Sequence, residues 1–194
     1  MRDKMVKNIM IVGVGGQGTL LTSRIIGRAA MKCGYDVKIS EVHGMAQRGG
    51  SVVTFVRFGD KVYEPVVEEG EADVIVAFER LEALRYLHFL KKDGTIVVND
   101  HRIDPMTVVT GAMKYPEGII ETLKGSCELV VIDGLKAALE LGNSKVLNSV
   151  VLGAAAKKIG FELDTWLSVI SETVPGKTIE INHKAFMKGY SAEN

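Results

Sequence analysis

The feature that most constrains the fold of this chain is an apolar run that ends in glycines and continues into a helical pattern. Residues 8–12 (NIMIV) are almost entirely apolar, which is typical of a strand buried in a parallel sheet. Apolar residues then recur at helical spacing over residues 19–31. Between the two patterns lies a glycine-rich turn that contains Gly13, Gly15, Gly16, Gln17 and Gly18. This order of strand, glycine turn and helix predicts the first unit of an α/β fold.

Strand and helix patterns alternate along the rest of the chain. Apolar and β-branched stretches predict further strands at 36–41, 51–58, 73–78, 95–98 and 129–132. A turn at 59–61 (GDK), with Val62 and Tyr63 returning, predicts a β-hairpin. Helices are expected at 79–90, 135–141, 145–158, 165–174 and 179–188. These patterns predict a mostly parallel, Rossmann-like α/β sheet with a β-hairpin insertion and a helical C-terminal third, built as a single domain over residues 1–194.

The charge balance excludes several classes of partner. The chain has 24 Lys and Arg residues against 24 Asp and Glu residues, so its formal net charge is 0. A general binder of nucleic acid or of anionic membranes usually has a basic excess. The first apolar run is too short for a signal peptide, and no stretch approaches the ~20 apolar residues of a membrane span. We therefore expect a cytoplasmic protein that binds neither nucleic acid nor membrane.

Few residues are suited to metal or redox chemistry. The two cysteines, Cys33 and Cys127, lie far apart and form no CxxC motif, which excludes an iron–sulfur cluster held by this chain alone. The four histidines show no metal-ligand spacing. The sequence also has no GxSxG nucleophile motif. We expect no metal site and no catalytic residue in this chain.

The glycine turn has two interpretations. Residues 13–18 match GxGxxG at the start of a helix, where glycines admit a ligand closely and free N–H groups attract a phosphate. Glu41, at the end of the second expected strand, stands where an acid would bind the ribose of a dinucleotide. The alternative is that the glycines only permit a tight turn. The hairpin interrupts the regular winding of the sheet, which weighs against NAD.

A second glycine-rich loop follows the second strand. Its candidate residues are His43, Gly44, Gln47, Arg48, Gly49 and Gly50. Such a loop can bring backbone close to a partner and direct a guanidinium at a carboxylate or a phosphate. The alternative is a solvated connection in which Arg48 pairs with a surface acid. For His43, a hydrogen bond within the loop is a simpler role than proton transfer, because no acid–base partner is evident.

Together the two glycine segments resemble a known family. GVGGQG at 13–18 and EVHGMAQRGGSV at 41–52 are similar to the gamma subunit, or gamma domain, of pyruvate and other 2-oxoacid:ferredoxin oxidoreductases. Within that family the chain is most similar to the small (beta) subunits of the indolepyruvate ferredoxin oxidoreductase type. NSVVLGA at 148–154, which begins with Asn148, and NHKAFMKG at 182–189 resemble two later segments of the family. The resemblance covers nearly the whole chain.

The resemblance implies a reaction and a division of labour. A 2-oxoacid, here an aryl pyruvate, is oxidatively decarboxylated on thiamine diphosphate, electrons pass through 4Fe–4S iron–sulfur clusters to ferredoxin, and coenzyme A takes the acyl group. It implies that a large partner subunit holds thiamine diphosphate, Mg²⁺ and the clusters. The glycine turn would then contact a coenzyme A phosphate, while Glu41, the second loop and Asn148 would shape the interface or active site. We expect the isolated chain to form a homodimer, because an obligate interface is large and apolar.

Other functions stay open at this point. The gamma subunits of pyruvate, 2-oxoisovalerate and 2-oxoglutarate enzymes share these motifs, so the sequence does not select the 2-oxoacid. A free-standing NAD(P)-dependent enzyme would use the glycine turn and Glu41, and would bind NADH without a partner. A non-catalytic nucleotide-binding module would also bind its ligand alone.

Overall fold

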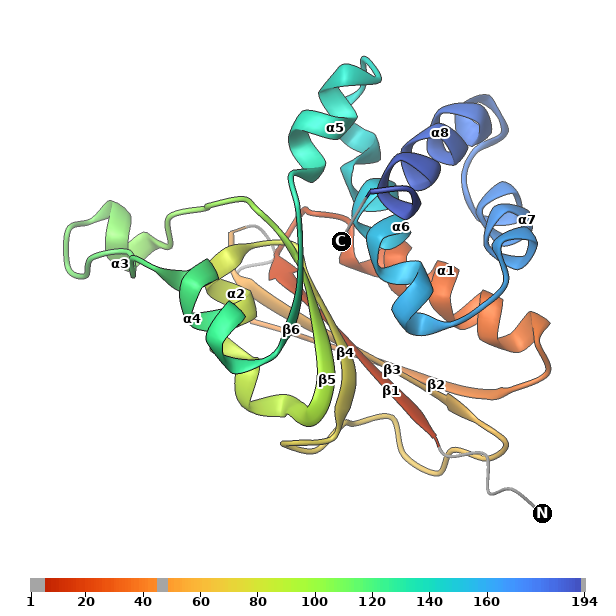
Figure 1. Cartoon of the computed structure of the whole chain (residues 1–194), viewed down its shortest axis with the longest axis horizontal. Coiled ribbons are helices and arrows are strands. Elements are labelled where there is room, and N and C mark those ends of the chain that lie inside the picture. Colours follow the sequence, from red (N-terminus) through yellow and green to blue (C-terminus); the bar gives the residue numbers. More distant parts are fainter. Residues whose placement is uncertain (1–5, 45–48, 193–194) are drawn as a thin grey trace.

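A single six-stranded sheet forms the centre of the part of the chain that the structure describes. This computed structural model describes residues 6–44 and 49–192. The strands are β1 (Lys7–Val14), β2 (Asp36–His43), β3 (Ser51–Gly59), β4 (Ala72–Ala77), β5 (Leu90–Asn99) and β6 (Glu128–Ile132). They lie in the order β2-β3-β1-β4-β5-β6 (Figure 1). β3 is antiparallel to both of its neighbours, whereas β1, β4, β5 and β6 pair in parallel. The predicted α/β, mostly parallel sheet is therefore confirmed.

The predicted hairpin was wrong in its partner. Residues 62 and 63 form no strand, and β3 instead lies between β1 and β2, with Val56 opposite both Ile9 and Ile39. β3 is apolar on both faces, so it is stabilised more by two neighbouring strands and two covering layers than by a short return strand. The return segment is held as a loop, in which the Val62 N–H donates to an Asp36 carboxylate oxygen at 2.9 Å.

Helices cover both faces of the sheet. One face carries α1 (Thr19–Lys32), α6 (Leu147–Ile159), α7 (Leu163–Thr173) and α8 (Ile179–Tyr190), and the other carries α2 (Arg80–Arg85) and α4 (Ile119–Ser126) (Figure 1). The remaining elements are α3 (Met106–Val109), α5 (Gly134–Glu140) and the short 3₁₀ turns η1 (Leu87–Phe89), η2 (Ser144–Val146) and η3 (Gly176–Thr178). The helical C-terminal third is as expected. The predicted helix at 79–90 is shorter, because β5 already begins at Leu90, and the sequence did not predict α3 and α4.

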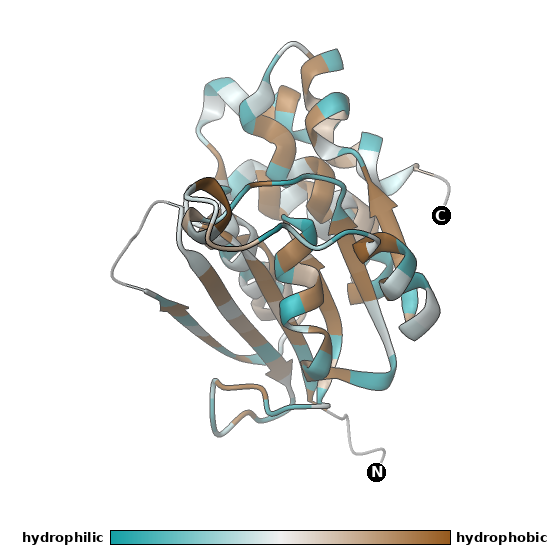
Figure 2. Ribbon diagram, turned by 90° about the vertical axis from the view of Figure 1, so that its left-hand side faces the viewer, coloured by the Kyte–Doolittle hydropathy of each residue, from teal (hydrophilic) through white to brown (hydrophobic). Residues whose placement is uncertain are grey.

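The central strand β1 shows how the two layers are filled. Ile9 and Ile11 pack into the cluster under α1 and α6, while Met10 and Val12 pack into the cluster under α2 and α4. All four side chains are fully buried. Figure 2 shows the inner strands as largely hydrophobic ribbons among helices that mix hydrophobic and hydrophilic residues. Burial on both faces explains why the strand is an unbroken apolar run rather than an alternating one.

Two helices of the C-terminal third pack backbone to backbone. A Cβ on Gly153 of α6 would lie 2.0 Å from the Phe186 carbonyl oxygen, and a Cβ on Gly189 of α8 would lie 1.9 Å from the Val150 carbonyl oxygen. Beside this contact the buried Ser149 hydroxyl donates to Asn182 Oδ1 at 2.6 Å. The two C-terminal sequence segments are therefore the two sides of one close helix crossing.

No helix in the described ranges is both long and apolar enough to cross a membrane.

Candidate phosphate-binding site

The glycine turn joins the end of β1 to the start of α1. Gly16 and Gly18 have φ of 104° and 87°, a left-handed conformation that favours glycine. Gly13 is needed for a different reason, since a Cβ there would lie 3.1 Å from Phe78 Cβ. The turn thus requires glycines for its own backbone, whatever it binds.

Gln17, a predicted ligand contact, has both ends of its side-chain amide engaged within the turn and sheet. Its Oε1 accepts from the Val14 N–H at 2.7 Å, and its Nε2 donates to the Phe78 carbonyl oxygen at 3.0 Å. These bonds fix the glycine turn between the ends of β1 and β4. Gln17 is therefore a positioning residue for the turn in this structure.

The second glycine loop meets the first. The Gly15 N–H donates to the Gly50 carbonyl oxygen at 2.9 Å, which brings the two sequence motifs side by side. Gly49 has φ of 78°, and it lines a small cavity of about 70 Å³ with Val14 and Ser51. Gln47 and Arg48 lie outside the described residues. The two motifs, which are distant in the sequence, are therefore in contact through Gly15 and Gly50.

An open cleft of about 430 Å³ lies beside the two loops. It is lined by Gly15, Gly16, Gly18, Thr19, Leu20, Glu41, His43 and Val52. Glu41 accepts a long hydrogen bond of 3.3 Å from the Thr54 hydroxyl, and His43 Nδ1 lies 3.1 Å from the neighbouring Gly44 carbonyl oxygen. Both side chains are exposed, so they form a wall of the cleft that solvent and ligands can reach.

The N-terminus of α1 opens into this cleft. The first N–H groups of a helix have no partner within it, and Gly18 supplies no side-chain cap. The first turn of α1 has no acidic side chain either. A phosphate or carboxylate placed there would accept from these N–H groups and lie at the positive end of a 14-residue helix.

Asn148 packs against the same turn from α6. It is 7% exposed, and a Cβ on Gly18 would lie 3.1 Å from its Nδ2. Its buried Oδ1 has no hydrogen-bond partner among the described residues. The structure thus brings Asn148 to the glycine turn across more than a hundred residues, next to the cleft rather than in its lining.

Three further residues line the cleft that were not predicted as site residues, namely Thr19, Leu20 and Val52. Thr19 and Leu20 could have been found, because they directly follow the glycine motif and must form the first helical turn. Val52 could not, because its position depends on the antiparallel pairing of β2 with β3, in which it lies opposite His43.

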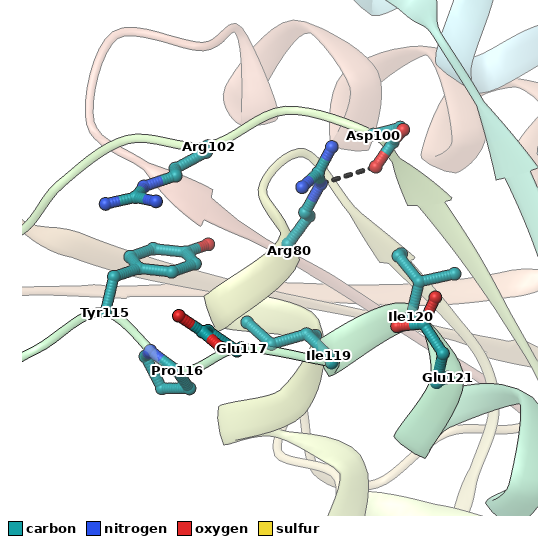
Figure 3. Close-up of a pocket in the computed structure, with 10 residues that line it drawn as sticks. Arg80, Asp100, Arg102, Tyr115, Pro116, Glu117, Ile119, Ile120 and Glu121 are labelled. Carbon is teal, nitrogen blue, oxygen red and sulfur yellow. Dashed lines mark ion pairs between the residues drawn. The ribbon is translucent and has the colours of Figure 1, made fainter.

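A second cavity of about 380 Å³ lies beyond the ends of β4 and β5 (Figure 3). Arg80 and Asp100 form an ion pair there, and the Arg102 guanidinium lies over the Tyr115 ring, 4.3 Å from its centroid. Glu117 and Glu121 also line the cavity. Two guanidinium groups thus lie among three carboxylates, and both guanidinium groups already have partners within the chain.

Tyr115 connects this cavity to a buried acid. Its hydroxyl donates to Glu79 Oε1 at 2.6 Å. Burial, together with this hydrogen bond to the Glu79 carboxylate, raises the pKa of the Tyr115 phenol well above its ordinary value. Tyr115 is therefore a hydrogen-bond donor rather than an acid at neutral pH. In the described ranges, this cavity included, no group of three His, Cys, Asp or Glu side chains could hold a metal ion.

Comparison with known proteins identifies the family. The family model described as pyruvate ferredoxin/flavodoxin oxidoreductase matches residues 8–192. The chain belongs to this family. Among its curated members, indolepyruvate oxidoreductase subunit IorB of Pyrococcus horikoshii is 45% identical, in an alignment that covers 95% of each sequence. The pyruvate/ketoisovalerate oxidoreductases common subunit gamma of Thermococcus kodakarensis is 30% identical over 92% of each sequence.

Solved structures of this oxidoreductase family share the fold. The gamma subunit of a keto/oxoacid ferredoxin oxidoreductase from Geobacter sulfurreducens superposes with a TM-score of 0.70 at 24% identity, over 95% of this chain and 96% of that one. The 2-oxoglutarate:ferredoxin oxidoreductase of Magnetococcus marinus superposes with a TM-score of 0.74 at 22% identity. That match covers 97% of this chain but only 31% of the Magnetococcus chain. In that enzyme the fold is therefore one part of a longer polypeptide.

Proposed function

We propose that this chain is the small subunit of a ferredoxin-dependent 2-oxoacid oxidoreductase of the indolepyruvate type. The complex oxidatively decarboxylates aryl pyruvates and transfers the acyl group to coenzyme A. One observation carries this proposal, namely the 45% identity to the Pyrococcus horikoshii subunit over 95% of both sequences. The second candidate is a gamma subunit of the pyruvate and ketoisovalerate type. We favour it less, because its identity to this chain is 30% rather than 45%.

The redox cofactors belong to the large partner subunit in this proposal. A 4Fe–4S cluster takes four cysteine thiolates, and this sequence has two cysteines. Cys33 is exposed and directly follows α1, whereas Cys127 is partly buried between α4 and β6. We therefore assign thiamine diphosphate, Mg²⁺ and the clusters to the large subunit, from which ferredoxin collects the electrons. No residue of this chain is assigned a catalytic role.

The contribution of this chain to the reaction is a wall of the coenzyme A site. The residues present fit a phosphate group, because the N–H groups at Gly16, Gly18 and Thr19 border an open cleft at a helix N-terminus without a side-chain cap. Coenzyme A supplies the thiol that accepts the acyl group. The residues of this chain hold its phosphates and orient them. Glu41 and His43 also line the cleft.

The second glycine loop and Asn148 form the border with the large subunit. Gly50 contacts the glycine turn through its hydrogen bond to Gly15, and Gln47 and Arg48 precede it in the sequence. We propose that Arg48→Ala weakens assembly or activity of the complex without unfolding the chain. The chain acts as a single domain, it pairs with itself when the large subunit is absent, and the complex is cytoplasmic.

Anaerobic affinity purification of the tagged chain from its native host tests this proposal. We expect a large partner with broad iron–sulfur absorbance, and reduction of ferredoxin or a viologen dye with indolepyruvate faster than with pyruvate. Faster turnover of pyruvate would support the gamma-subunit alternative instead. A colourless chain that purifies alone and binds NADH would contradict the subunit assignment.

A further inference from the structure

The least explained surface of the molecule is a projecting segment, residues 102–117, which we call the arm. It leaves the sheet after β5, carries α3 and extends away from the body (Figure 1). Met106, Val109 and Met113 are 70%, 65% and 63% exposed. No side chain of α3, which lies wholly within the described residues, is buried. Figure 2, in which this side of the molecule faces the viewer, colours α3 as largely hydrophobic.

The apolar residues of the arm are not explained by folding. Short helices in proteins are stabilised mainly by packing of an apolar face, and α3 places Met106 and Val109 on one face without burying either. Val108 points the other way and packs against the core cluster that includes Tyr115 and Ile119. The arm therefore has an inner anchor and an outer apolar face. Clustered exposed apolar side chains of this kind mark interaction surfaces.

The arm is held in place at both ends by one buried carboxylate. Glu79 Oε1 accepts from the Ile103 N–H at 3.2 Å and from the Tyr115 hydroxyl at 2.6 Å. Arg102 stacks on the Tyr115 ring and also pairs with Asp104 at 2.6 Å. An arm fixed in this way loses little conformational entropy when it docks.

We propose that the arm docks into an apolar, uncharged groove on the large subunit of the complex. This inference rests on the proposed function, because it assumes that such a subunit exists. The chemistry of the groove follows from the arm, since residues 105–113 (PMTVVTGAM) contain no charged residue. A charged groove would have to leave its charges buried without partners.

The position of the arm favours the large subunit over a second copy of this chain. Ile103 and Pro105, at the base of the arm, line the small cavity that Val14 and Gly49 also line. A subunit that covers the glycine loops would therefore also lie next to the base of the arm. The cavities of this chain at the glycine turn, beside Arg80 and along α5 all carry charged side chains, so a second copy offers no matching groove there.

The test compares binding of two double variants to the purified large subunit. Met106→Glu/Val109→Glu places two carboxylates on the arm, and Met31→Glu/Leu139→Glu places two on exposed apolar positions of α1 and α5. We expect the dissociation constant to rise at least about tenfold for the arm variant and less than about twofold for the control. Circular dichroism and the thermal midpoint verify that both variants are folded.

Every other outcome would contradict either the docking proposal or the proposed function. Wild-type affinity in the arm variant, or equal weakening in both variants, would overturn the docking proposal. Conversion of a wild-type dimer to a monomer, with unchanged binding to the large subunit, would mean that the arm contacts a second copy. Failure of the wild-type chain to bind the large subunit would overturn the proposed function itself. If the glutamates unfold the chain, Met106→Ser/Val109→Ser removes the apolar face without adding charge and is judged by the same criteria.

Discussion

The side-chain amide of Gln17 donates a hydrogen bond of 3.0 Å to the backbone carbonyl oxygen of Phe78. This bond joins the ends of β1 and β4. After β1 the chain continues into α1 on one face of the sheet, and after β4 it continues into α2 on the other face. Open α/β sheets usually bind ligands at such a crossover. Here the glycine turn opens toward β2 instead, into the cleft that Glu41 and His43 line. The position of the candidate site therefore depends on Gln17, whose side-chain amide makes its hydrogen bonds to backbone groups of the protein.

Removing the Gln17 amide should loosen the glycine turn. Gln17→Ala leaves the Val14 N–H and one acceptor site of the Phe78 carbonyl without their partner, so we expect the free energy of unfolding to fall by about 1–3 kcal/mol. Gln17→Glu keeps an acceptor for Val14 but places a carboxylate against the Phe78 carbonyl, and should be at least as destabilising. Urea unfolding measures both variants. Wild-type stability in the alanine variant would refute the positioning role.

A negative charge at the start of α1 should weaken coenzyme A binding. Leu20 lines the cleft in the first turn and is 44% exposed, so Leu20→Glu competes with a phosphate for the same N–H groups. We expect the dissociation constant of the complex for coenzyme A to rise about threefold to tenfold, measured by isothermal titration. Met31→Glu, at the far end of α1, is the control and should leave it unchanged. Equal affinities of the wild type and Leu20→Glu would place the phosphate elsewhere.

The close crossing of α6 and α8 should not tolerate one added methyl group. Gly189→Ala puts a Cβ 1.9 Å from the Val150 carbonyl oxygen, so the helices must separate. We expect the free energy of unfolding to fall by about 2 kcal/mol or more. Gly125→Ala, on the exposed side of α4 with no atom within 4 Å, should leave it unchanged or raise it by up to about 1 kcal/mol. If both variants melted at the wild-type temperature, the observed helix spacing would be wrong.

The Tyr115 phenol should ionise only above the pH range of an ordinary phenol. Burial and the Glu79 carboxylate raise the pKa of Tyr115 in the folded state above the value of about 10 of an unfolded chain. A raised folded-state pKa gives stability that is fully present below pH ~10 and is lost as the pH rises beyond it. The stability difference between the wild type and Tyr115→Phe should therefore shrink above that pH. Tyrosinate absorbance at high pH checks this, since the Tyr115→Phe variant should lack the component that titrates above the ordinary range.

Some parts of the candidate site could be predicted from the sequence because they depend on local conformation. The left-handed backbone of Gly16 and Gly18 demands glycine wherever the turn occurs, so the motif at 13–18 predicts the turn and the start of α1. Glu41 and His43 follow from the end of a recognisable strand. The partners of Gln17 could not be predicted, because the Phe78 carbonyl is a backbone atom sixty-one residues away.

The apolar strands, the glycine turn, the helical C-terminal third and the family of this protein could be predicted from its residues, because each depends on residues close together in the chain or on motif identity. The folded chain was needed to show that β3 inserts between β1 and β2, that Asn148 lies against Gly18, and that Met106 and Val109 lie outside the core. The physical reason is that apolar segments of similar composition can pair with several neighbours. The choice among these neighbours is made by the packing of the whole chain.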